Sequence, residues 1–313
     1  MKEESYLHVA VGVIKDDDGN ILISLRHDAA HQGGLWEFPG GKVEPGESVE
    51  QALTRELKEE LDISVHELSP LIKIKHQYSD LNVLLDVWKV SHFLGKAIGC
   101  EGQQIKWVRP AQLTDYSFPK ANIPIITAAR LPTEYAILNA GKESDLLTDL
   151  KKLLAKDIKL IQARVKSLTA TEAAHFIQLA MALCKAKGAS LLINSEVENA
   201  RELKVDGLHL TSTDLLTLQH RPTGYNWIAA SCHNQQQLKH AEKIALDFVV
   251  LSPVLATKTH PESEPLGWGE FKSLAETVNI PVYALGGMQK RYCQKAQSLG
   301  AQGIAGITGF LEG

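Results

Sequence analysis

Three acidic residues in the sequence RELKEE have a spacing that could hold a metal ion. Glu56, Glu59 and Glu60 stand at positions i, i+3 and i+4, so on a helix all three carboxylates project to one side. Like charges at this spacing cost roughly 0.2–0.5 kcal/mol per pair unless a positive group joins them. Because carboxylate oxygens suit hard cations, the cluster predicts a site for Mg²⁺ or Mn²⁺. Arg55 can pair with Glu59 one turn further on and fix that carboxylate.

The residues before this cluster form a glycine-rich turn that leads into a helix. Gly40, Gly41 and Gly46 permit tight backbone turns at positive φ. Apolar residues then recur every four positions over residues 47–61, which predicts a helix with one buried face. A solvated acidic helix face is the alternative interpretation of a bare ExxEE pattern. The joint presence of the glycine turn, Glu47 and Arg55 favours the metal site instead.

Composition excludes several classes of protein. The chain has 313 residues, 44% of them hydrophobic and 22% charged, with a net charge of −4. These values are typical of a globular protein with two domains, and they give no basic footprint for nucleic acid. We predict neither a membrane segment nor a signal peptide, and the dispersed cysteines Cys100, Cys184, Cys232 and Cys293 suggest a reducing, cytoplasmic compartment. The oligomeric state stays open.

The first predicted domain covers residues 1–131 and has an α+β pattern. Two strands, Leu7–Ile14 and Ile21–Leu25, flank the turn signal at residues 16–20, which predicts a β-hairpin. Further strands are expected at 73–78, 83–93 and 105–108, and a short helix at 125–130.

The second predicted domain covers residues 134–313 and alternates strands with helices. Helices are expected between most of the strands, for example at 171–187, 235–245 and 290–299. Eight strands alternating with helices is the count for a small (β/α)₈ TIM barrel, an α/β fold. The predicted strands are 135–138, 158–161, 190–193, 207–210, 227–230, 248–251, 282–285 and 303–306.

The first domain resembles the Nudix hydrolases, whose box reads G-x5-E-x7-R-E-U-x-E-E-x-G-U, where U is a bulky aliphatic residue. The chain departs from it at Asp62, where the family has glycine, and aspartate tolerates the left-handed conformation better than most residues. The resemblance implies an α/β/α sandwich and metal-dependent hydrolysis of a nucleoside diphosphate linkage. It implies catalytic roles for Arg55, Glu56 and Glu101, with Glu56 and Glu101 both open as the base. The implied metal ligands are the Gly40 carbonyl, Glu56, Glu59, Glu60 and Glu101.

The segment LWEFPGGKVE over residues 35–44 is similar to the MutT branch, which removes oxidised purine nucleotides. That similarity implies that Arg26 binds phosphate and that Asn122 reads the purine edge, since an amide offers both a donor and an acceptor. The implied substrate-binding positions are Arg26, His31, Glu37, Phe38, Pro39, Gly40, Lys42 and Asn122.

The second domain resembles thiamine-phosphate synthase and its relative, the thiazole tautomerase. Matching segments include IQARVK at 161–166, LINS at 192–195 and ALGG at 284–287. They lie at the ends of predicted barrel strands, where such barrels keep their sites. The implied phosphate-site residues are Gln162, Arg164, Lys166, Asn194, Gly286 and Gly287.

The barrel also departs from these relatives. Ser195 stands where the synthase has an aspartate that binds Mg²⁺, although Asp214 matches the second acidic position. His260 replaces the lysine of the synthase loop, and Pro253 replaces the catalytic histidine of the tautomerase. A degenerate module that binds a thiamine-related phosphate is therefore an alternative to catalysis. We interpret His209 and His233 as core or strand-cap histidines.

The main hypothesis is hydrolysis of 8-oxo-dGTP to the monophosphate and pyrophosphate, which cleans the nucleotide pool and avoids mutations during DNA replication. One alternative keeps the Nudix chemistry but acts on thiamine-related or other diphosphates. Another makes the barrel a regulatory domain that binds a thiamine phosphate.

Overall fold

The computed structural model describes residues 6–28, 32–139, 142–257 and 264–311. The chain divides into two compact units, Met1–Arg130 and Leu131–Gly313, and each is described by itself. Among the described residues, no helix combines the length and the hydrophobicity that a transmembrane span requires.

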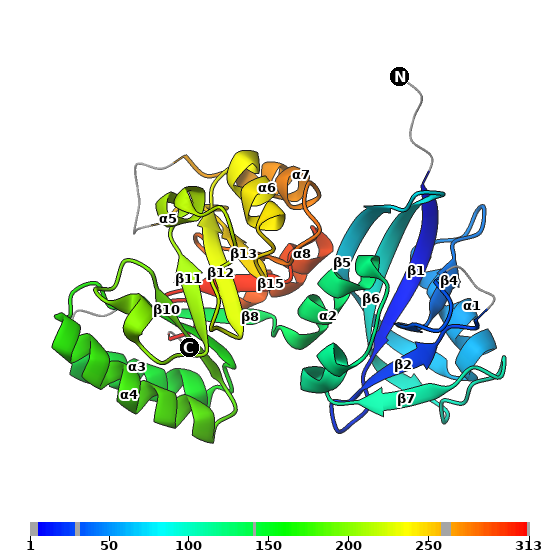
Figure 1. The fold of residues 1–313 in the computed structure, drawn as a ribbon, viewed down its shortest axis with the longest axis horizontal. Helices are drawn as coiled ribbons and strands as arrows, with labels where there is room; N and C mark the ends of the chain where they lie inside the picture. The colour runs from blue at the N-terminus through cyan, green and yellow to red at the C-terminus, as the bar shows by residue number, and fades with distance from the viewer. Residues whose placement is uncertain (1–5, 29–31, 140–141, 258–263, 312–313) are drawn as a thin grey trace. The chain divides into compact units, whose positions relative to one another are not determined.

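The N-terminal unit is built on two β-sheets (Figure 1). In the first sheet β1 runs parallel to β6 and antiparallel to β4, and β5 runs antiparallel to β6. Its order is β4-β1-β6-β5, formed by Gly40–Lys42, Leu7–Ile14, Asn82–Leu94 and Ser64–Gln77. The second sheet is antiparallel, with the order β3-β2-β7, formed by Trp36–Glu37, Ile21–Leu25 and Ile105–Val108.

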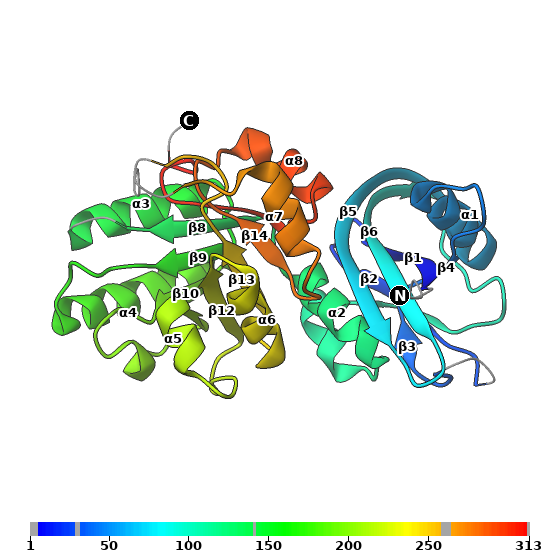
Figure 2. The ribbon, with the colours of Figure 1, turned by 90° about the horizontal axis from the view of Figure 1, so that it is seen from above.

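Helices cover the sheets from two sides, which completes the expected α/β/α sandwich. Helix α1 (Val49–Leu61) buries Leu53, Leu57 and Leu61 in one apolar core, as the four-residue repeat predicts. Helix α2 (Ile123–Arg130) lies in a separate core, and Figure 2 shows the two helices on opposite sides of the sheets. The 3₁₀ helices η1 and η2, at Pro110–Asp115 and Lys120–Asn122, precede α2.

The predicted hairpin between the first two strands is wrong. Strand β1 pairs with β4 and β6, whereas β2 pairs with β3 and β7 in the other sheet. Next to the turn, an isolated bridge joins Lys15 and Ile21, and the Asp16 amide donates to the Asn20 carbonyl at 3.0 Å. Ile14 and Leu22 are buried in one core and Val13 and Ile23 in another, so each strand has two apolar faces that need separate layers.

The C-terminal unit is a closed barrel of eight strands, β8 to β15, and all neighbours are parallel. The strands are Glu134–Leu138, Leu160–Ala163, Ser190–Asn194, Gly207–Leu210, Trp227–Cys232, Phe248–Leu251, Val282–Ala284 and Gly303–Gly306. The helices α3 to α8 are Glu143–Ala155, Ala170–Ala186, Ser212–Thr217, Gln235–Lys243, Gly267–Ala275 and Cys293–Ser298, with 3₁₀ helices η3 and η4 at Ala200–Glu202 and Lys290–Tyr292.

Both predicted fold classes are therefore confirmed, although the bounds of several elements differ from the predicted ones. The largest difference is in the N-terminal unit, where the strand expected at 73–78 is the end of β5, which begins at Ser64. The strand expected at 158–161 is β9, which begins two residues later, and the helix expected at 290–299 is divided into η4 and α8. Inside the barrel, large residues such as Tyr135, Phe248 and Tyr283 are fully buried and fill the interior. Since the strands are parallel, their carboxyl ends gather at one end of the barrel, which is where its pocket lies.

Candidate functional sites

The turn before α1 positions the acidic face of that helix. Ser48 caps the helix and forms a capping box with Gln51, which fixes the point where the helix begins. A Cβ at Gly41 would lie 2.1 Å from the carboxyl carbon of Glu56, and one at Gly40 would lie 2.1 Å from the Ala10 carbonyl oxygen. Gly40, whose φ is 145°, therefore requires glycine because a side chain there would meet the β1 backbone, whereas a side chain at Gly41 would displace the end of the Glu56 side chain.

Arg55 joins the carboxylates of this face. Its Nη1 donates to Glu56 Oε1 at 2.8 Å and to Glu59 Oε2 at 3.4 Å, which agrees with the predicted pairing. Its Nη2 donates to Glu47 Oε1 at 2.7 Å and to the Lys42 carbonyl at 3.1 Å. The contact with Glu47 was not predicted from helical spacing, because Glu47 lies in the preceding turn. Arg55 thus connects the turn to the helix and orients Glu56.

We expect that replacing Arg55 by lysine lowers kcat about tenfold, because one ammonium group cannot bridge several carboxylates as the guanidinium fork does. The measurement is steady-state turnover of nucleotide, with thermal unfolding followed in parallel. Lys58→Gln is the control, since Lys58 is an exposed cation on the same helix that pairs only with Asp62 among the described side chains. Equal losses in both variants would contradict an orienting role for Arg55.

Glu60 is the carboxylate most affected by its surroundings. Partial burial, followed by the negative charges of Glu37, Glu56 and Glu101, raises its pKa to about 8. The Gly40 amide donates to Glu60 Oε2 at 3.3 Å. Such crowding of carboxylates suits a divalent cation chemically, because a positive ion removes the repulsion that the four acids impose on one another.

The described acidic side chains are not arranged as a metal site in this structure. Within the described residues no group of three or more His, Cys, Asp or Glu side chains is arranged to hold a metal. Arg55 binds two of the expected ligands, Glu56 and Glu59, and the Glu59 side chain is 59% exposed.

Glu101 lies on a loop attached to the end of α1. The Cys100 amide and the Gln103 side-chain amide both donate to the Glu60 carbonyl, at 2.9 and 3.0 Å. Glu101 itself is exposed, and its charge acts on Glu60. Asp62, which ends the helix, has a φ of 53°, so the predicted left-handed aspartate is confirmed. The structure thus brings Glu101 to the acidic face, while Gln103 was missed from sequence.

A second group of predicted residues surrounds the end of β2. Arg26 forms an ion pair with Glu37, and burial raises the pKa of Glu37. The Arg26 Nε is buried and meets no hydrogen-bond partner in the described part of the chain. Tyr78, which sequence reasoning missed, has a hydrogen bond with the Ala121 backbone and feels the charge of Arg26. It therefore connects Arg26 to the segment that holds Asn122.

Two aromatic rings pack together beside this group, in the core of the unit. Phe38 stacks on Phe118, with ring centroids 5.4 Å apart and planes at 26°. Asn122 is 8% exposed and lies in η2. Pro39 accepts from the Gly12 amide at 2.8 Å, and Lys42 is exposed at the end of β4. His31 lies outside the described residues.

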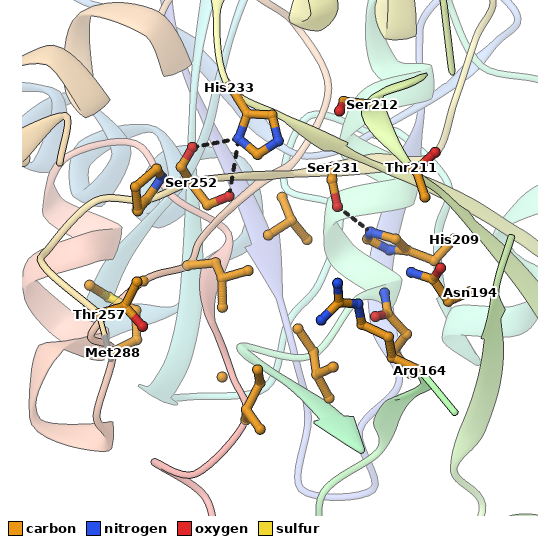
Figure 3. Close-up of a pocket in the computed structure, with 18 of the residues that line it drawn as sticks. Arg164, Asn194, His209, Thr211, Ser212, Ser231, His233, Ser252, Thr257 and Met288 are labelled. Carbon is orange, nitrogen blue, oxygen red and sulfur yellow. Dashed lines mark hydrogen bonds between the residues drawn. The ribbon is translucent and has the colours of Figure 1, made fainter. Parts of the chain in front are cut away.

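The barrel contains a pocket of about 1320 Å³ at the carboxyl ends of its strands (Figure 3). Five of the six predicted phosphate-site residues line it, and the sixth, Lys166, reaches it through an ion pair with the lining residue Glu196. The five are Gln162, Arg164, Asn194, Gly286 and Gly287. The two glycines have φ values of 102° and 65°, a region that favours glycine.

A buried hydrogen-bond network forms the floor of this pocket. His209 contacts the Tyr135 hydroxyl at 3.1 Å and the Ser231 hydroxyl at 2.9 Å, and the Gln162 amide donates to Tyr135 at 3.2 Å. Burial, followed by the charge of Arg164, lowers the pKa of His209 to about 3, so the imidazole stays neutral. His209 is thus a satisfied core histidine that also lines the pocket.

His233 lies at the end of β12 on the pocket rim. Figure 3 shows its ring beside Ser252, where Nδ1 donates to the Ser252 carbonyl at 2.8 Å. Pro253 also lines the pocket, whereas His260 falls outside the described residues.

Comparison with known proteins identifies the family of each unit. Residues 134–310 match the thiamine monophosphate synthase family and residues 10–128 match the NUDIX domain family. The chain therefore belongs to both families, as a Nudix hydrolase domain followed by a thiamine-phosphate synthase-like barrel.

Individual relatives match one domain each. A putative thiamine-phosphate synthase 2 of Aquifex aeolicus is 38% identical over 184 residues, which cover 58% of this chain and 99% of the relative. The 8-oxo-dGTP diphosphatase of Escherichia coli is 39% identical over 120 residues, covering 38% and 93%. The CTP pyrophosphohydrolase of Escherichia coli is 39% identical over 135 residues, covering 43% and 96%.

Two solved structures are each similar to part of the chain. A MutT structure from a study of Aliivibrio salmonicida and Vibrio cholerae is 42% identical and covers 40% of this chain and 98% of that chain, with a TM-score of 0.36. A thiamine phosphate pyrophosphorylase of Pyrococcus furiosus is 21% identical and covers 56% and 85%, with a TM-score of 0.45.

Proposed function

We propose that the N-terminal domain hydrolyses 8-oxo-dGTP to the monophosphate and pyrophosphate and so removes oxidised purine nucleotides in the cytoplasm. The observation that supports this proposal is the crowding of Glu37, Glu56 and Glu101 around Glu60, beside the Arg26 and Phe38 group. A relative named 8-oxo-dGTP diphosphatase is 39% identical over nearly its whole length.

The proposed site holds Mg²⁺ or Mn²⁺ through the Gly40 carbonyl, Glu56, Glu59, Glu60 and Glu101. When bound, the cation neutralises phosphate oxygens and lowers the pKa of water. A water oxygen attacks phosphorus, one P–O–P bond breaks, and the proton of the water passes to a carboxylate. Glu56 and Glu101 are the two candidates for that base, and Arg55 orients Glu56.

Recognition of the oxidised base is assigned to the Asn122 region. The Asn122 amide offers a donor and an acceptor to the edge of a purine. An 8-oxo purine differs from guanine by a carbonyl and by an N7–H. A site that accepts a hydrogen bond from N7–H leaves its acceptor unpaired when guanine binds.

We expect dGTP to be the poorer substrate, since an unpaired buried polar group costs about 1–3 kcal/mol, or roughly 5- to 150-fold in kcat/KM. Pyrophosphate release from dGTP and 8-oxo-dGTP is measured at matched concentrations. The Asn122→Ala substitution should reduce the difference in kcat/KM between 8-oxo-dGTP and dGTP. Equal kcat/KM for both nucleotides in the wild-type protein would refute this specificity.

A second candidate function of the Nudix domain is the same hydrolysis reaction acting on a different substrate. The similar CTP pyrophosphohydrolase is as close in sequence, and the fused barrel favours thiamine-related diphosphates. A pyrophosphate- or phosphate-release screen over oxidised dNTPs, CTP and thiamine diphosphate separates these substrates.

For the barrel we propose a binding role toward a phosphate-bearing small molecule, such as a thiamine-related phosphate. The polar pocket with Arg164, Asn194 and the glycines at 286 and 287 supports it. Calorimetric titration of the full chain with thiazole phosphate tests this role, and the absence of heat would remove it.

A further inference from the structure

The barrel has a serine at the position where its family resemblance implies a metal-binding aspartate. The Ser195 hydroxyl donates to Asp214 Oδ2, and the Thr211 hydroxyl donates to the same oxygen at 2.9 Å. The Thr211 amide in turn donates to Ser195 Oγ at 3.0 Å. Asp214 is thus held by hydroxyl donors at the beginning of α5, and Ser195 adds no negative charge.

This donor set does not fit Mg²⁺. The ion binds several oxygens in near-octahedral geometry and depends on carboxylate charge. Of the two positions, Ser195 and Asp214, only Asp214 offers a carboxylate. One oxygen of that carboxylate already accepts two hydrogen bonds from hydroxyl groups. A diphosphate that needs a metal to balance its charge therefore has no suitable partner here.

The cationic side chains of the pocket, Arg164 and Lys166, lie close to a carboxylate of the protein itself. Glu196, next to Ser195, forms an ion pair with Lys166, and its Oε2 lies 3.8 Å from Arg164 Nη2. Glu196 and Arg164 both line the pocket, where Arg164 lies close to Asn194 and His209 in Figure 3. The Glu196 side chain is 40% exposed, so it can move into solvent. The Glu196 carboxylate therefore stands where an anionic ligand could lie between Arg164 and Lys166.

We propose that the barrel binds a ligand with a single phosphate group without any divalent metal, and that this phosphate displaces Glu196 from Arg164 and Lys166. The proposal rests on the binding role proposed above. A phosphate monoester carries a charge of about −1.5 to −2 at pH 7, which two released cations balance. A diphosphate without metal leaves negative charge uncompensated. Glu196 is then the residue that sets the affinity and the charge preference of the pocket.

The test is calorimetric titration of the full chain with inorganic phosphate in a buffer that contains a chelator. We expect Glu196→Gln to bind phosphate about fivefold more tightly than wild type, because its cations no longer have to be freed. Glu198→Gln is the matched control, since it removes the same charge two residues away on an exposed side chain. Arg164→Gln should abolish the binding, which assigns the heat to the barrel. Added Mg²⁺ should leave the Arg164-dependent binding unchanged.

Each of the other possible results of this titration contradicts a specific part of the proposal. Equal tightening in Glu196→Gln and Glu198→Gln means a general charge effect and refutes the displacement. Binding that depends on Arg164 but is equal in Glu196→Gln and wild type also refutes it, while the binding role of the barrel survives. Strengthening of that binding by Mg²⁺ refutes metal independence. Absence of heat from every variant refutes both the displacement and the phosphate site, and nucleotide turnover of the same samples judges the Nudix proposal separately.

Discussion

Replacing Glu56 by glutamine should lower kcat for 8-oxo-dGTP at least about 100-fold, as expected when a metal-binding or base carboxylate is removed. Glu56 accepts from Arg55 at 2.8 Å and lies against Gly41, so its carboxylate is fixed from two sides. Glutamine keeps the shape of the side chain but loses the negative charge. The measurement is pyrophosphate release at saturating substrate, so that the loss appears in kcat.

Glu50→Gln is the matched control for this change. Glu50 is exposed in the first turn of the same helix, and its substitution alters the net charge equally. We expect its turnover to stay within about twofold of wild type, because surface substitutions of this kind have small effects. Near-normal turnover of a folded Glu56→Gln protein would remove Glu56 from both proposed roles. The same assay on Glu101→Gln, with pH–rate profiles, then compares the two candidate bases.

The acidic helix was predictable because its information is local. Helical spacing alone places Glu56, Glu59 and Glu60 on one side, and the leucine repeat determines which side is buried. The contact between Arg55 and Glu47 depends on how the preceding turn folds back. Such a contact has no periodic signal, although the turn glycines indicate that the backbone returns there.

Strand partners were harder to predict than strands. Alternating residues locate β1 and β2 accurately, but both strands are apolar on both faces, and their pairing is decided by which core each face joins. The barrel avoids this ambiguity, because a series of buried parallel strands joined by helices closes in few ways. Its strands were therefore predictable, whereas the bond between Ser195 and Asp214 required coordinates.

Removal of divalent metal should abolish nucleotide hydrolysis by the Nudix domain, a loss of at least about 1000-fold. The free energy from metal assistance is several kcal/mol, and each 1.36 kcal/mol corresponds to tenfold in rate. Burial, followed by the negative charges of Glu37, Glu56 and Glu101, raises the pKa of Glu60 to about 8, and these charges would otherwise repel a triphosphate of about four negative charges. The measurement is turnover after dialysis against a chelator, followed by addition of Mg²⁺ or Mn²⁺.

The same ions should also raise the thermal unfolding temperature, because a ligand that binds only the folded state stabilises it, by about 2.7 kcal/mol at 100 times Kd. Glu60→Gln provides the internal comparison, since it removes a proposed ligand near Gly40 and should reduce the metal-induced shift. Lys58→Gln, which changes an exposed cation on the same helix, should keep that shift. Full turnover in the chelated protein would contradict metal dependence, and equal shifts in all three proteins would place the ion away from the acidic face of α1.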